Sequence, residues 1–181
     1  MKPFTTPELM PNGKRAFRYQ CEGVDCGALG RLLEGRKLVA YVLPEGHTLQ
    51  VAWELSFAFE SGFVLEFSSA CTEVAEWQEV GSLNIRLTHL STPAGTTTVV
   101  THRSELQPID VVWAEKLIYE DQDVVVECGL VLRGGEGQEV VIAAGIPPGS
   151  VSVRAPFSPA LFEPQFPLPA CRREPVGQAK N

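Results

Sequence analysis

Hydrophobic and polar residues alternate along most of the chain with a period of two, which is typical of β-strands that bury one face. The clearest run extends from Leu49 to Phe59, and after a turn at Gly62 the alternation resumes from Phe63 to Phe67. We expect these two runs to form a hairpin over a shared core. The same pattern predicts further strands over residues 38–43, 83–88, 96–101, 109–119, 124–132, 139–144 and 150–154.

Residues 109–119 fit either a helical face or a strand. We favour the strand, because the segment is rich in β-branched residues and the acidic turn at 120–123 leads into the next strand. One short helix is predicted over residues 26–34, with Asp25 as its N-cap and Gly35 as a left-handed stop. A hairpin is predicted between residues 83–88 and 96–101, with its loop around residues 91–95.

These elements predict a mainly β fold, a single-domain antiparallel β-sandwich or barrel of about ten strands with one or two short helices. The length of 181 residues suits one domain. We divide it into an extended arm (1–13), the β-rich domain (14–155), and a proline-rich extended segment with a tail (156–181), the tail starting at Arg172. In the last part, apolar side chains are expected to anchor the segment on the sheet: Phe157, Leu161, Phe162, Phe166 and Leu168.

A strand-and-glycine pattern occurs twice, in residues 49–88 and 124–155. Aligning Gly62 with Gly137 also brings Gly81 onto Gly149, provided that the first copy carries a short insertion. One interpretation is two half-folds related by an approximate two-fold axis. The other is two unrelated hairpins that share common turn chemistry.

Charge argues against nucleic acid as a partner. The chain has 15 basic and 22 acidic side chains, a net charge of −7, and the basic residues are scattered. Phosphate recognition needs a concentrated basic face. An acidic surface suits a basic protein partner.

Neither a secretory signal nor a membrane span is expected. Residues 1–11 lack a long apolar stretch, and acidic residues interrupt the longest apolar runs. Five cysteines are an odd number without a tight framework, which suits a reducing compartment. We therefore expect a cytoplasmic protein, in which Cys71 and Cys128 are small buried hydrophobic side chains and the Cys21–Cys26 spacing does not form a metal site.

Catalytic motifs are absent from the sequence, and its three histidines, His47, His89 and His102, do not form a metal-ligand pattern. In the predicted hairpin, His89 and His102 would not face each other. We expect no catalytic residue, no metal and no cofactor.

The strongest candidate for function is the insertion between Phe67 and Gly81, which contains Glu73, Glu76, Trp77 and Glu79. An aromatic residue among carboxylates has the composition of a contact site for a basic protein. We therefore predict a non-catalytic binding or accessory protein, of which an immunity-type inhibitor of a basic toxin is one version. In the opposing interpretation, Trp77 folds back onto the sheet and the glutamates face water.

The alternative function is an enzyme or a small-ligand-binding barrel, with a cavity between the two half-folds. Its predicted lining is aromatic: Trp53, Phe57, Phe59 and Trp113. Open strand edges would also allow two copies of the chain to pair as a homodimer.

Overall fold

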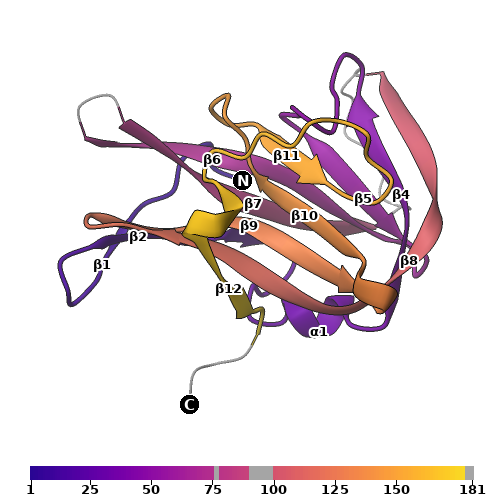
Figure 1. Ribbon diagram of the computed structural model, residues 1–181, viewed down its shortest axis with the longest axis horizontal. Helices are drawn as coiled ribbons and strands as arrows, with labels where there is room; N and C mark the ends of the chain where they lie inside the picture. The colour runs from indigo at the N-terminus through magenta and orange to yellow at the C-terminus, as the bar shows by residue number, and fades with distance from the viewer. Residues whose placement is uncertain (76–77, 90–99, 178–181) are drawn as a thin grey trace.

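The computed structural model describes residues 1–75, 78–89 and 100–177 (Figure 1). The fold is mainly β, as predicted, and consists of one sheet of 12 strands curled into a half-barrel with a few short helices. The elements, in chain order, are β1 (Glu8–Leu9), β2 (Arg15–Phe17), β3 (Gln20–Glu22), α1 (Leu29–Leu33), β4 (Arg36–Pro44), β5 (Leu55–Phe59), β6 (Phe63–Ala75), β7 (Gln78–His89), β8 (Thr101–Glu120), β9 (Val124–Gly134), η1 (Gly135–Gly137), β10 (Glu139–Ala144), β11 (Val151–Arg154), η2 (Leu168–Ala170) and β12 (Cys171–Pro175).

The strands follow the order β1-β2-β9-β8-β4-β5-β6-β7-β3, with β10 and β11 continuing from β9 and with β12 on β8. Two pairs are parallel, β2 with β9 and β3 with β7, and the other pairs are antiparallel. In both parallel pairs a short strand near the chain start docks beside a strand that comes much later.

The predicted strand from Leu49 to Phe59 is only partly formed, since β5 begins at Leu55. Residues 49–52, which precede β5, instead lie along the edge of β11. Ala52 and Val151 exchange backbone hydrogen bonds of 3.0 and 2.7 Å, and the N–H of Val153 donates to the carbonyl of Leu49 at 2.7 Å. This segment therefore satisfies backbone groups at the outer edge of β11.

The long hairpin β6–β7 replaces the loop insertion expected at residues 70–80. Register pairs continue from Phe63↔His89 to Ala75↔Gln78. Gly81 lies inside β7 opposite Cys71, whereas Gly149 lies in a turn with φ of +80°. The two glycines therefore do not occupy equivalent positions, although Gly62 and Gly137 both lie in turns between paired strands with φ of 85° and 76°.

The predicted hairpin between residues 83–88 and 96–101 is wrong. β7 pairs with β6 and β3, whereas β8 pairs with β4, β9 and β12. Most of the expected returning strand lies outside the described residues. The preference for a strand at 109–119 is confirmed by β8, which spans Thr101–Glu120.

The helix is shorter than predicted. It covers Leu29–Leu33, and the Asp25 carboxylate accepts a hydrogen bond from the N–H of Gly27 at 2.7 Å in the turn before it. Gly35 takes the expected left-handed conformation with φ of 70°.

Four apolar clusters lie in the described part of the sheet, and two of them are large. The main core contains the fully buried side chains Phe57, Phe59, Leu65, Phe67, Leu83 and Ile85, among others. The C-terminal cluster contains Phe17, Leu117, Val126, Cys128 and Val141, with Tyr119, Phe162, Phe166, Leu168 and Cys171 packed against it at partial exposure.

Residues 172–176 do not form the solvated tail predicted from Arg172. Residues Cys171–Pro175 form β12, which pairs with β8, and Val176 beyond it is 7% exposed. In Figure 1 the proline-rich segment and β12, drawn in orange to yellow, run in front of the central strands. Phe157 packs on the main core, while Leu161 is 70% exposed and anchors nothing.

Candidate functional site

The predicted acidic segment forms the end of the β6–β7 hairpin. Glu73 and Glu79 are exposed and lie directly opposite each other in the strand register. Glu76 and Trp77 lie outside the described residues. Like charges directly across a strand pair are destabilising, so this hairpin end carries a local excess of negative charge.

A hollow of about 270 Å³ lies at the base of this end of the hairpin, and we call it the acidic hollow. It lies between the hairpin, the turn that joins β8 to β9, and the proline-rich segment. The residues that line it are Arg15, Val74, Gln78, Glu79, Val80, Tyr119, Asp121, Asp123, Val124 and Phe166.

One wall of the acidic hollow is aromatic. The rings of Tyr119 and Phe166 stack with centroids 4.2 Å apart and an interplanar angle of 15°. Tyr119 comes from β8, whereas Phe166 comes from the proline-rich segment, so the C-terminal part of the chain completes the wall. A flat, rigid apolar surface of this kind packs against aliphatic or cationic side chains.

Asp121 is held rigidly at the rim. Its carboxylate accepts hydrogen bonds from the N–H groups of Asp123 and Val124 at 2.8 and 2.9 Å. Burial acts to raise the pKa of Asp121, but these hydrogen bonds, together with one from Tyr119 and the charge of Lys14, outweigh it and hold the pKa below its usual range. Asp121 is therefore a fixed negative charge.

Glu79 and Asp123 complete the acidic rim. Burial, together with a hydrogen bond to the Glu79 carboxylate, raises the pKa of the Cys71 thiol to about 11. The cation in the lining, Arg15, donates to the carbonyl of Val74 at 2.6 Å and so ties β2 to the hairpin. Three carboxylates therefore face one guanidinium around this hollow.

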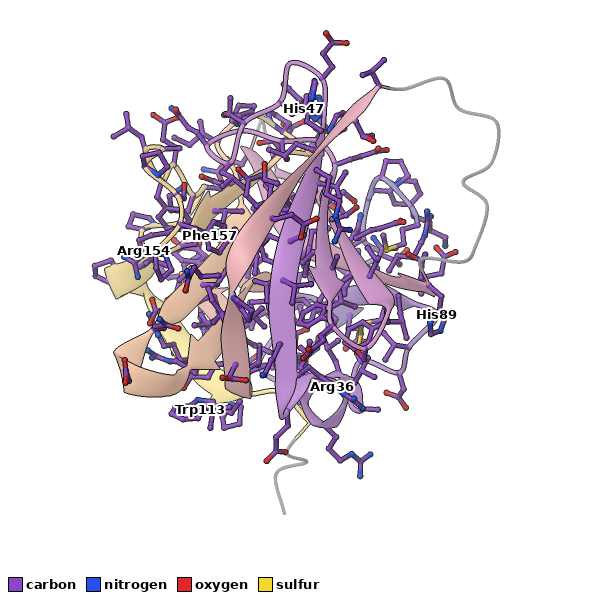
Figure 2. The ribbon with its side chains drawn as sticks, turned by 90° about the vertical axis from the view of Figure 1, so that its right-hand side faces the viewer. Arg36, His47, His89, Trp113, Arg154 and Phe157 are labelled. Atoms are coloured by element: carbon purple, nitrogen blue, oxygen red, sulfur yellow. A yellow bond between two sulfur atoms is a disulfide. The ribbon has the colours of Figure 1, made fainter. Side chains whose placement is uncertain are left out.

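A second hollow of about 440 Å³, the aromatic hollow, lies beside the first half of β8. Its walls include the stacked rings of Tyr41 and Phe157, with centroids 5.7 Å apart; Figure 2 labels Phe157 beside this strand. The full lining is Tyr41, Ser104, Glu105, Leu106, Gln107, Pro108, Ile109, Gln138, Pro156 and Phe157.

A bulge in β8 forms one side of the aromatic hollow. Leu38 pairs with Ile109 and Ala40 pairs with Glu105, so residues 106–108 stand opposite Val39 alone. Pro108 has no N–H for the ladder, which accounts for the interruption. Within the described part of the chain, no strand pairs with the other edge of β8 here.

The four aromatic residues predicted to line a cavity are not brought together. Phe57 and Phe59 are 0% and 1% exposed within the main core. Trp53 and Trp113 are 49% and 48% exposed, and Trp53 packs on His47. None of the four lines either hollow.

The sequence reasoning missed Asp121, Asp123, Tyr119 and Phe166. The available signal was the acidic turn at 120–123, which looks like an ordinary solvated turn until the hairpin and Phe166 are placed beside it. His89 and His102 are exposed and lie on strands that do not pair with each other. Among the described residues, no group of three or more histidine, cysteine or acidic side chains is placed to hold a metal ion.

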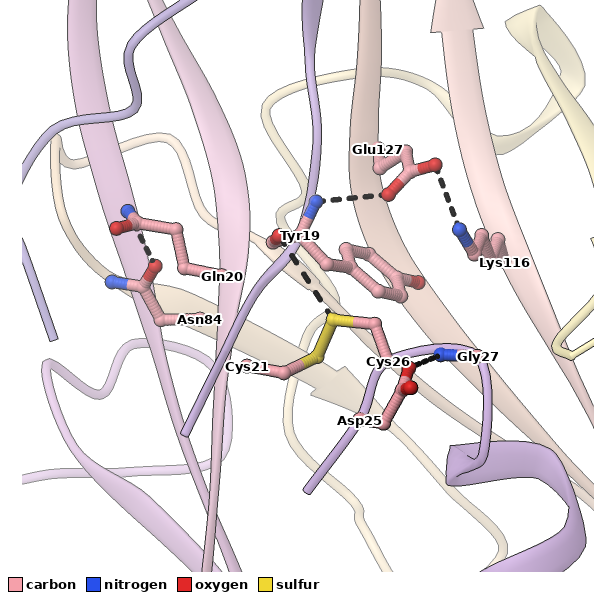
Figure 3. Close-up of a disulfide and its surroundings, with 9 residues drawn as sticks. All are labelled: Tyr19, Gln20, Cys21, Asp25, Cys26, Gly27, Asn84, Lys116 and Glu127. Atoms are coloured by element: carbon pink, nitrogen blue, oxygen red, sulfur yellow. Dashed lines mark hydrogen bonds and ion pairs between the residues drawn. A yellow bond between two sulfur atoms is a disulfide. The ribbon is translucent and has the colours of Figure 1, made fainter. Parts of the chain in front are cut away.

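Cys21 and Cys26 form a disulfide, shown in Figure 3, which the number and spacing of the cysteines did not predict. Disulfides persist mainly in oxidising compartments, so the cysteine argument for a reducing compartment no longer holds. Near this bond the buried carboxylate of Glu127 accepts hydrogen bonds from the N–H of Tyr19 and from Lys116 Nζ, both at 2.8 Å.

The chain matches no protein-family model, and no curated protein or solved structure is significantly similar to it. In the ranges that the structure describes, no helix has both the length and the apolar character needed to cross a membrane.

Proposed function

We propose that this protein is a binding protein that recognises a basic protein partner, and that the acidic hollow receives a lysine or arginine side chain of that partner. The observation that carries the proposal is the rim of Glu79, Asp121 and Asp123 around the stacked rings of Tyr119 and Phe166. The stem of a long basic side chain can lie against the rings while its charged head reaches the carboxylates.

The end of the hairpin extends the same negative surface. Glu73 and Glu79 repel each other across the strand pair, and a bound cation would relieve that repulsion. The net charge of −7 also favours the approach of a basic partner over longer distances.

The direct test measures binding of a fluorescent hexalysine peptide to the purified protein at low salt, with Asp123→Asn as the variant. We expect its affinity to fall about tenfold, because a charged hydrogen bond is lost. Glu60→Gln is the matched control, since it removes the same charge from an exposed turn at the other end of β6. Equal weakening in both variants would show that only net charge attracts the peptide, and would overturn the proposal.

A second candidate is supported by the aromatic hollow, whose volume and mixed lining suit a small planar organic ligand. Thermal-shift screening with a set of planar aromatic fragments tests it. A fragment that raises the melting temperature of the wild-type protein and of Leu161→Ala, but not of Phe157→Ala, would support this use of the hollow. Equal shifts in all three proteins would contradict it.

A further inference from the structure

Two thiols from distant parts of the chain meet in the C-terminal cluster. The Sγ atoms of Cys128 and Cys171 are 3.8 Å apart, although 43 residues separate them in the sequence. Cys128 belongs to β9 and Cys171 to β12, and both strands pair with residues 115–119 of β8. The two strands must therefore lie on opposite edges of β8, and the thiols meet across it.

A β-bulge sets the position of Cys128. Leu117 pairs with Gly129 and Ile118 pairs with Glu127, which leaves Cys128 as the extra residue. Bulges change the direction of a side chain relative to the regular strand. The Cys128 thiol is buried, 2% exposed as a residue, and lies 3.5 Å from the carbonyl oxygen of Leu117.

The two thiols differ in exposure and in charge. Cys171 is partly exposed, whereas Cys128 is buried. A hydrogen bond from Cys128, helped by the charge of Arg173 and opposed by burial, lowers the pKa of the Cys171 thiol. The same contact and burial raise the pKa of Cys128. Cys171 is thus the better nucleophile, and Cys128 keeps its proton.

This arrangement places a reactive thiol, Cys171, beside a thiol that could resolve a mixed disulfide, Cys128. The other cysteines do not compete for either role in the folded chain, because Cys21 and Cys26 are bonded to each other and the Cys71 thiol bonds to Glu79. We propose that Cys171 and Cys128 form a redox-active dithiol, which a low-molecular-weight disulfide oxidises by two electrons.

The reaction has two steps. The Cys171 thiolate attacks one sulfur of the small disulfide, so that a mixed disulfide forms and one small thiolate leaves. Cys128 then gives its proton to the small thiolate released in the first step, and its sulfur attacks Cys171 Sγ and expels the second small thiolate, which takes up the proton that Cys171 had released to solvent. The protein loses two electrons and two protons, and the small disulfide becomes two thiols.

Closing the bond must shorten the sulfur separation from 3.8 Å to roughly 2 Å, and it must bring the backbones of β9 and β12 within roughly 7 Å, whereas strands on opposite edges of β8 lie roughly 10 Å apart. Because β8 lies between the two strands, this movement draws β12 toward β9 across it. Arg173, on the same short strand as Cys171, donates a hydrogen bond from Nη1 to Glu139 of β10 at 2.9 Å. A movement of β12 would also disturb this hydrogen bond. We therefore expect the bond to be readily reduced, and its formation to loosen β12 from β8.

The test uses the purified full chain with its Cys21–Cys26 disulfide intact. The protein is incubated with oxidised glutathione, alkylated with N-ethylmaleimide in denaturant so that the buried Cys128 thiol is also reached, and weighed by intact mass spectrometry. Before oxidation we expect three maleimide adducts, one for each of the three free cysteines, and afterwards only one on Cys71. Peptide mapping should find Cys128 linked to Cys171, and hydrogen exchange should rise in β12.

Single variants separate the roles. In Cys128→Ser the reaction should stop at a glutathione adduct on Cys171. In Cys171→Ser, Cys128 should stay unmodified. Cys71→Ser is the control, in which the bond between Cys128 and Cys171 should still form. Circular dichroism melts confirm that each variant is folded. The proposal is overturned if Cys171 of the Cys128→Ser variant takes up no glutathione, or if that variant reacts while the wild-type protein keeps both thiols open to maleimide.

Discussion

The main core and the C-terminal cluster are built on the same sheet, yet they are closed in different ways. The main core is sealed by large side chains from several neighbouring strands, and Phe57, Phe59 and Phe67 are at most 1% exposed. The C-terminal cluster is covered by a segment with little regular structure, and its outer members Tyr119, Phe166 and Cys171 remain partly exposed. The difference separates a region that is shielded from solvent from one whose outer aromatic and thiol groups remain within reach of solvent.

The largest expected effect comes from matched phenylalanine truncations in the two regions. Phe67→Ala in the main core should lower the free energy of unfolding by about 3–5 kcal/mol, because it leaves a cavity that neighbouring strands cannot fill. Phe166→Ala should cost about 1–2 kcal/mol, since that ring is already partly exposed. Urea unfolding of both variants measures the difference, and equal losses would contradict the distinction between the two clusters.

The next largest loss of unfolding free energy is expected from substitution of a buried carboxylate. Glu127 is 3% exposed and is bonded to Tyr19 and Lys116, so Glu127→Gln should cost about 2–3 kcal/mol by weakening the bonds to two fixed donors. Glu8→Gln is the control. Glu8 is an exposed partner of Arg18 at 3.4 Å, and its loss should change the urea midpoint little. A similar midpoint for both variants would show that burial of Glu127 contributes nothing.

A smaller effect is expected at the edge of the C-terminal cluster, where Glu139 of β10 is bonded to arginines on three other strands. Its carboxylate accepts hydrogen bonds from Arg133 and Arg154 at 2.5 Å and from Arg173 at 2.9 Å. Glu139→Gln should therefore cost about 1–2 kcal/mol at neutral pH, because the arginines are partly solvated and their attraction is screened.

The pH dependence of Glu139 has a definite sign. Arg173, followed by Arg154 and Arg133, lowers its pKa from an ordinary value of 4.5 to about 2 against the opposing effect of burial. Its contribution is thus complete above pH 4.5 and is lost as the pH falls toward 2. Melts from pH 7 to 2 should show the wild-type protein and Glu139→Gln converging in this window. Parallel curves would mean that another group causes the acid loss.

Several strands could be predicted from the sequence because their alternation reflects a local requirement. A strand with one buried face must place apolar residues at every second position, and this identified the strands that became β4, β8, β9, β10 and β11. Positive φ at Gly35, Gly62 and Gly137 was predictable for the same reason, since these turns need a residue without a Cβ.

Pairing was harder to predict, because it depends on residues far apart in the chain. The sequence suggested that residues 83–88 pair with residues 96–101 across a short loop, but β7 pairs with β6 and β3 instead. The loop predicted before Gly81 is instead part of the β6–β7 hairpin. The polar residues within 72–79 resemble a loop in the sequence, because their partners across the hairpin cannot be read from it.

Of the candidate site, the sequence could identify the acidic residues but not their setting. Glu73 and Glu79 were recognised by charge alone, whereas Asp121, Asp123 and Phe166 join Glu79 only because the hairpin, the β8–β9 turn and the proline-rich segment converge. Phe57 and Phe59, predicted to line a cavity, are core residues, because an apolar aromatic looks the same in a sequence whether it faces a cavity or a packed interior.

The sequence by itself determined the mainly β class, the turns and the acidic character of the surface, since each follows from the residue types within a short window. Tertiary structure decided which strands meet, where the proline-rich segment lies and which cysteines become neighbours. Cys128 and Cys171 come within 3.8 Å only because β9 and β12 both dock on β8. Such contacts depend on the free energy of the whole folded chain, and no local pattern records them.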